Sequence, residues 1–162
     1  MADAAKDTSI AFNPAKYQQG DSIIQAYINA YPDKPQGYSL RTRYAKASDR
    51  DTSKGLAAGP IEQYNEFLAK DTAASNKKTM FTNYYYLLIY YAQYAKDLPK
   101  EQEYQKAIDI TTKMKQIYSD PNSEEYQFAD KTGKQIQQTL DKYNKSKAAG
   151  GGGTGAAGKS QK

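Results

Sequence analysis

The sequence predicts an all-α protein: an α-solenoid of about three antiparallel helix pairs, closed by a C-terminal capping helix. Three observations predict this fold. Apolar residues recur at spacings of three and four through most of the 162 residues, which is the period of a helix with one buried face. Valine is absent, whereas sheet proteins rely on β-branched residues. Alternate helices also share one pattern of small and large residues, as in repeat proteins.

The first two helices are delimited by prolines. Asn13 is a favourable N-cap and Pro14 fits the first helical position, so the first helix begins there and ends before Pro32. The second helix follows Pro35 and stops in the polar loop 48–53.

The next two helices differ in how far they should be buried. The third runs from about Ala57 to Leu68, and Pro60 marks either its start or a bend. The fourth, from about Asn76 to Lys96, is apolar nearly all round, so we expect other parts of the fold to cover several of its sides.

The last two helices begin after clear start signals. The fifth follows Pro99 and ends at Pro121, and the sixth begins near Asn122, with Glu125 placed for a capping box. The sixth has one apolar stripe, which suits a helix at the end of a stack. Its members are Tyr126, Ala129, Gly133, Ile136, Leu140 and Tyr143.

Composition divides the chain into three segments. Residues 1–13 are interpreted as a flexible linker, residues 14–144 as the helical repeat domain, and residues 145–162 as a disordered tail rich in glycine and lysine. The net charge is +5, and the tail carries four lysines without an acidic residue. The pI near 9 therefore reflects mainly the tail rather than a basic face on the helical domain.

Helices one, three and five can be aligned without gaps, at offsets of 37 and 50 residues. A small residue recurs, followed by larger residues four, seven and eleven positions later. The four aligned sets are Gly20, Ala57 and Ala107; Ile24, Ile61 and Thr111; Tyr27, Tyr64 and Met114; and Tyr31, Leu68 and Tyr118. We expect the small residue to admit a close neighbouring helix.

This pattern resembles the tetratricopeptide repeat family. Gly20, Ile24 and Pro32 match the second helix of that repeat in register, and Tyr38 takes the aromatic position of the first helix. Arg41-Thr42 replaces the family's leucine–glycine pair. The stretch YPDKPQGYSLRTRYAKASDRDTSKGLAAGPIEQYNEFLAKD is similar to divergent repeats of long exported proteins in Gram-negative bacteria. The resemblance implies a right-handed superhelix and the C-terminal part of a longer repeat protein.

The resemblance also implies a binding face for another protein, because the first helix of each pair lines the concave side in this family. Arg43 and Lys46 would pair with acidic groups of the partner, while Tyr85 and Ile89 would supply apolar contact. Ser39 and Tyr85 break the pattern of the family's carboxylate clamp. The expected face consists of Gln36, Ser39, Arg43, Lys46, Thr82, Tyr85, Ile89 and Gln93.

The expected function is a non-enzymatic scaffold or adaptor. The alternative is binding of an anionic polymer, a nucleic acid or a glycan, through exposed tyrosines and the basic tail. Cysteine and histidine are absent, and we expect neither a metal nor a cofactor. The sequence shows no apolar run long enough for a membrane span. The location would be periplasmic or in the cell envelope if a signal peptide had been removed, and cytoplasmic otherwise.

Three motifs match patterns of nucleotide binding, hydrolysis and calcium binding, but each lacks part of what that function requires. The run from Gly153 to Ser160 fits a phosphate-loop pattern, but no strand precedes it. Glu62 and Glu66 share a helix face and represent a third option, a hydrolase. The loop with Asp49 lacks the glycine and glutamate of a calcium loop.

Overall fold

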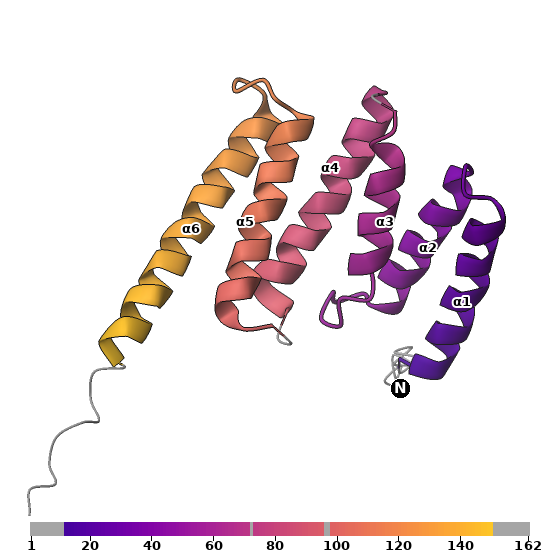
Figure 1. Ribbon diagram of the computed structural model, residues 1–162, viewed down its shortest axis with the longest axis horizontal. Coiled ribbons are helices and arrows are strands. Elements are labelled where there is room, and N and C mark those ends of the chain that lie inside the picture. The colour runs from indigo at the N-terminus through magenta and orange to yellow at the C-terminus, as the bar shows by residue number, and fades with distance from the viewer. Residues whose placement is uncertain (1–11, 72, 96–97, 151–162) are drawn as a thin grey trace, which may run out of the picture. The chain divides into compact units, whose positions relative to one another are not determined.

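The computed structural model describes residues 12–71, 73–95 and 98–150, and in these ranges helices alternate with short connections and no strand occurs (Figure 1). The all-α prediction is therefore confirmed. The helices fall into two compact units, the first ending at Lys70 and the second starting at Asp71. Within the described ranges, no helix combines the length and the apolar character that a membrane span requires.

The first unit contains α1 (Pro14–Ala30), α2 (Pro35–Ser48) and α3 (Ala58–Leu68). The start of α1 agrees with the prediction, because the Asn13 side chain accepts a hydrogen bond from the Lys16 backbone N–H at 3.1 Å. Pro60 lies in the first turn of α3, where its missing N–H breaks no helical hydrogen bond. The helix therefore begins just before this proline.

A glycine permits the close approach of α1 and α2. A Cβ atom at Gly20 would lie 2.6 Å from Cζ of Tyr44, so any other residue there would collide with the tyrosine ring. The Tyr44 ring stacks on Tyr17 with centroids 5.4 Å apart, and its hydroxyl donates to the Lys16 carbonyl at 3.1 Å. Gly20, the small residue in the aligned pattern of the first helix, thus lets α2 approach α1 closely, as the pattern predicts.

Arg41 joins all three helices of the first unit. Its Nε and Nη2 donate to the two carboxylate oxygens of Asp21 at 2.7 and 2.8 Å, and its Nη1 donates to Oε1 of Gln63 at 2.9 Å. The hydrogen bond to Asp21 raises the pKa of Arg41. Arg41 is therefore a polar cross-link between α1, α2 and α3.

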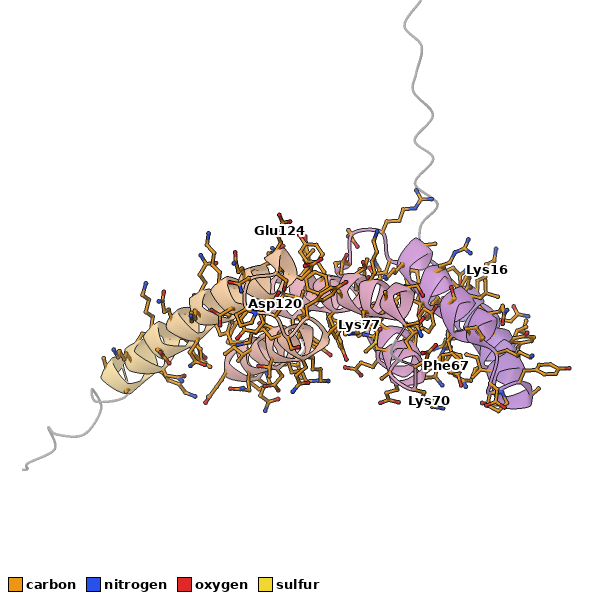
Figure 2. All side chains as sticks on the ribbon, turned by 90° about the horizontal axis from the view of Figure 1, so that it is seen from above. Lys16, Phe67, Lys70, Lys77, Asp120 and Glu124 are labelled. Carbon is orange, nitrogen blue, oxygen red and sulfur yellow. The ribbon has the colours of Figure 1, made fainter. Side chains whose placement is uncertain are left out.

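All three helices contribute buried residues to the core of the first unit, Ile28 from α1 among them. Tyr38 stacks on Phe67, which is labelled in Figure 2, with 4.7 Å between ring centroids. Buried Thr42 donates its hydroxyl to the Pro60 carbonyl at 3.2 Å, so its polar group has a partner inside the core. Ile61 has no exposed surface.

The second unit contains α4 (Ala74–Ile89), the π-helix η1 (Tyr90–Tyr94), α5 (Lys100–Ile117) and α6 (Glu124–Gly150). The fourth helix thus starts two residues before the expected position and ends in a wider turn, where the Ala95 N–H donates to the Tyr90 carbonyl at 3.0 Å. The spacing of its apolar residues does not distinguish this π turn from an α turn.

Small and buried residues bring α5 and α6 together. A Cβ atom at Gly133 would lie 2.6 Å from Oγ1 of Thr111, so the two helices touch at this point. Ala107, Met114 and Ala129 have no exposed surface. The stripe on the sixth helix therefore does face a neighbouring helix, as its spacing predicts.

Both ends of α6 differ from the expected bounds. The N-cap is Ser123 rather than Asn122, because Oγ of Ser123 accepts a hydrogen bond from the Tyr126 N–H at 3.3 Å. This start follows a turn between Asp120 and Glu124, both labelled in Figure 2. At the other end α6 continues to Gly150, so the first six residues of the predicted 145–162 tail are helical.

Candidate protein-binding surface

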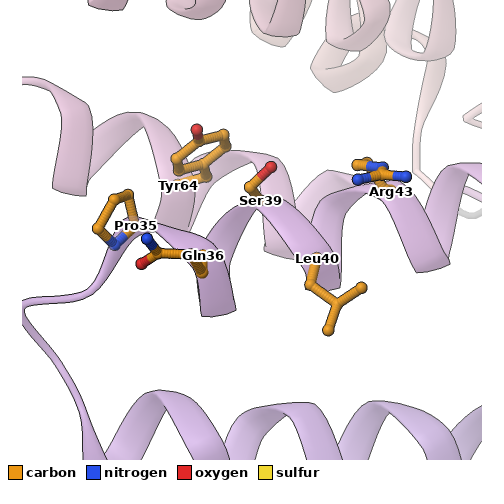
Figure 3. A pocket seen from close by; sticks show the side chains of 6 residues that line it. All are labelled: Pro35, Gln36, Ser39, Leu40, Arg43 and Tyr64. Atoms are coloured by element: carbon orange, nitrogen blue, oxygen red, sulfur yellow. The ribbon is translucent and has the colours of Figure 1, made fainter.

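Three of the expected site residues line one depression in the first unit (Figure 3). Helical spacing puts Gln36, Ser39 and Arg43 on one side of α2, and Tyr64 of α3 supplies the opposite wall. The depression has a volume of about 330 Å³ and is open to solvent. Its complete lining is Pro35, Gln36, Ser39, Leu40, Arg43 and Tyr64.

The depression combines apolar and polar groups. Leu40 remains 50% exposed, although leucine is usually buried. Arg43 is exposed, and it has no ion-pair partner among the residues that the structure describes. The surface therefore offers one apolar contact, two hydrogen-bonding side chains and one available positive charge.

Lys46 lies one turn beyond Arg43 on α2 but differs in environment. Its side chain is half-buried, and this burial lowers the pKa of its ammonium group. Lys46 does not line the depression. Within the expected face, Arg43 is thus the cation best placed to meet a ligand in this hollow.

The four expected residues of the second unit divide by exposure. Thr82, Tyr85 and Gln93 are exposed, whereas Ile89 is half-buried. Gln93 belongs to η1 rather than to a continuous α-helix. The Thr82 hydroxyl already donates to the Lys78 carbonyl at 3.0 Å, so Tyr85 is the most available apolar member of this group.

Tyr85 belongs to an aromatic patch, which consists of Phe81, Tyr85, Tyr118 and Phe128. The Tyr85 and Phe128 rings lie 5.6 Å apart between centroids, and 46% and 38% of these two residues are exposed. The Phe81 ring lies near the rings of Tyr118 and Phe128, with 5.4 and 6.4 Å between the ring centroids. The patch therefore joins α4 to the start of α6 within the second unit.

Phe128 is a residue that sequence reasoning missed. It lies one position before Ala129 and therefore outside the apolar stripe that faces α5. A phenylalanine outside the stripe of a terminal helix is the one sequence signal that could have indicated it.

Other candidate chemistry does not form a site. Glu62 and Glu66 are both exposed on α3, which gives neither carboxylate the apolar pocket that acid catalysis requires. The buried carboxylate of Asp49 accepts hydrogen bonds from the backbone N–H groups of Lys54 and Leu56, so it organises its own loop. The described residues contain no cluster of three potential metal ligands. The run 153–160 lies outside the described residues.

Comparisons with known proteins give no match: no protein-family model, no curated protein and no solved structure is similar to this chain.

Proposed function

We propose that this chain is a non-enzymatic protein-interaction module, a scaffold or adaptor that binds a peptide segment of another protein. The depression on α2 carries the proposal, because it gathers an exposed leucine, polar side chains and an available guanidinium in one place. The resemblance to tetratricopeptide repeats supports the same function, since those repeats bind peptides with their first helices.

The lining predicts the chemistry of the bound segment. Leu40 and Tyr64 favour an apolar side chain, and Gln36 and Ser39 can exchange hydrogen bonds with a peptide backbone. Arg43 favours a carboxylate, which a guanidinium can bind with two parallel hydrogen bonds. The proposed ligand is a segment in which an aspartate or glutamate neighbours an apolar residue.

The second unit contributes a separate apolar contact. Tyr85 and Phe128 present adjacent aromatic rings, and exposed aromatic side chains supply large contact area at a small entropic cost. In the proposed solenoid the helix pairs stack as a right-handed superhelix and α6 is its cap. The sixth helix has a single apolar stripe, which packs on α5 at Gly133, and this supports the capping role.

Selection from a displayed peptide library tests the proposal, using the whole chain as bait. We expect enriched peptides to contain an acidic residue beside an apolar one. Arg43→Glu should then weaken the binding of a selected peptide at least about tenfold, because it replaces a charge-assisted contact with a repulsion between two carboxylates. Fluorescence anisotropy with the labelled peptide measures this change.

Arg50→Glu is the matched control, since Arg50 is exposed in the loop after α2 and the substitution makes the same change in charge. Equal losses in both variants, together with a steep loss of affinity between low and physiological salt, would favour the alternative of an anionic-polymer ligand. Unchanged affinity in Arg43→Glu would contradict the proposed site.

A further inference from the structure

Two of the exposed tyrosines of this chain are neighbours on α1. All 16 tyrosines lie in the described residues, and the exposed ones are Tyr27, Tyr31 and Tyr85, at 42%, 54% and 46%. The Tyr27 and Tyr31 rings lie 5.1 Å apart between centroids, at an angle of 46°. The ring beside Tyr85 is that of Phe128 instead. Two phenol rings that are both open to solvent thus lie in contact at the end of α1.

The backbone holds this pair in place. The two residues are four apart, so the helix puts their side chains on one face. The Tyr31 N–H donates to the Tyr27 carbonyl at 2.9 Å. A Cβ atom at Gly37 would lie 2.9 Å from Cδ1 of Tyr27, so one edge of the Tyr27 ring rests against α2. The two rings are therefore positioned for a reaction with each other before any reagent arrives.

The other tyrosine pairs are less accessible to a reagent in solution. Pairs with neighbouring rings also occur at Tyr17–Tyr44, Tyr90–Tyr91 and Tyr104–Tyr143. All six of these residues are half-buried or buried. Tyr17 and Tyr44 also donate their hydroxyls to the backbone carbonyls of Leu56 and Lys16. An oxidant that acts from solvent therefore meets a reactive pair of phenols first at Tyr27 and Tyr31.

The composition directs one-electron oxidation to tyrosine. The chain has neither cysteine nor tryptophan, which removes the thiol and indole groups that compete for such oxidants. Met114 has no exposed surface.

We propose that Tyr27 and Tyr31 form an oxidative cross-linking site, at which a haem peroxidase and hydrogen peroxide join the two rings as dityrosine. Each phenol gives up one electron and one proton, which leaves two tyrosyl radicals. The radicals form one bond between an ortho carbon of each ring, and the hydrogen on each of these carbons then moves to the phenolic oxygen. Hydrogen peroxide takes up the two electrons and two protons and becomes two water molecules.

The cross-link would staple the last turn of α1. Tyr31 is the C-cap of this helix, and helix ends open readily in solution. A covalent bond between the two side chains restricts the open state, so the Tyr31 amide should exchange its hydrogen more slowly in the oxidised protein.

Treatment of the full chain with a haem peroxidase and hydrogen peroxide tests this proposal. At a chain concentration of about 5 µM, coupling within one molecule should prevail, because a tethered neighbour has an effective concentration on the order of 1 mM. We expect a monomer that is lighter by two hydrogen atoms and shows the fluorescence of dityrosine. Tandem mass spectra of its digest should lack backbone fragments between residues 27 and 31, since both residues belong to one covalent ring.

Tyr31→Phe keeps the ring but removes the phenol, and it should lower the yield of this product at least about tenfold. Tyr85→Phe is the matched control, because Tyr85 is similarly exposed but has a phenylalanine as its ring neighbour, and it should give the yield of the unmodified chain. An unchanged yield in Tyr31→Phe, a cross-link mapped to another pair, or covalent dimers as the main product would overturn the proposal. A lack of any cross-link in the unmodified chain would overturn it as well.

Discussion

Arg41 and Arg43 lie two positions apart on α2, and the helix therefore directs them to different faces. Arg41 binds Asp21 and Gln63 and holds three helices together. Arg43 is exposed at the depression that we propose as the binding site. At the scale of single residues, environment rather than residue type separates a structural cation from one available to a ligand.

The close contact at Gly20 predicts a loss of stability in Gly20→Ala. Alanine is the better helix former by about 1 kcal/mol, but its Cβ would displace the Tyr44 ring from Tyr17, and overpacking of this kind costs about 1–3 kcal/mol. Urea unfolding should therefore show a net loss of about 1 kcal/mol. Gly59→Ala, where a Cβ would meet no atom within 4 Å, should instead gain about 0.5 kcal/mol. Equal effects at both positions would contradict this explanation.

Tyr17 predicts a specific loss of stability at alkaline pH. Burial, followed by the nearby Asp21 carboxylate, raises the pKa of Tyr17 to about 12. The unfolded chain loses this proton near pH 10, before the folded chain does, so the free energy of unfolding falls as pH rises from about 10 to about 12. Tyr17→Phe should show a shallower fall over that window in urea titrations at several pH values. A Tyr17→Phe slope equal to that of the unmodified chain would refute this assignment.

At the scale of helices, sequence signals located all six α-helices of the described residues, but not the π-helix η1 and not every helix end. Caps and prolines act locally, so Asn13-Pro14 correctly indicates the start of α1. Two candidate caps stand side by side before α6, and both asparagine and serine suit that position. Which of the two side chains accepts the hydrogen bond from the Tyr126 N–H depends on the conformation of the loop that connects α5 to α6.

The cap of α6 predicts unequal effects of two neighbouring alanine substitutions. Ser123→Ala removes the side-chain oxygen that accepts from the Tyr126 N–H, and the free energy of unfolding should fall by about 1 kcal/mol. Asn122→Ala should change it by less than about 0.5 kcal/mol, because exposed side chains outside such contacts contribute little. Thermal unfolding followed by circular dichroism compares the two, and a larger loss in Asn122→Ala would restore the capping box expected from the sequence.

At the scale of the molecule, the chain consists of two compact units, each with buried residues of its own. Ile61 is fully buried in the first unit and Met114 in the second. Regions of a protein that bury their own residues can open separately, with a stability set by the contacts inside each region.

Core substitutions should therefore act mainly within their own unit. Ile61→Ala should cost about 3 kcal/mol and accelerate hydrogen exchange in α1, α2 and α3 more than in α5 and α6. Met114→Ala is the reciprocal variant and should give the opposite distribution. Uniform acceleration along the chain in both variants would show that the molecule unfolds as one cooperative body.

The sequence by itself determined the fold class, the six helices and the residues that form their stripes, because helical periodicity, caps and prolines depend on neighbours within a few positions. The choice of Gln36, Ser39 and Arg43 came from the resemblance to tetratricopeptide repeats, and their spacing of three and four residues puts them on one side of a helix. Which of these faces contacts another helix is a non-local property. Only the tertiary structure decided that Tyr27 is exposed while its repeat equivalent Met114 is buried, since burial depends on whether a neighbouring helix is present. It likewise brought Phe128 beside Tyr85, two residues far apart in the sequence that no local pattern connects.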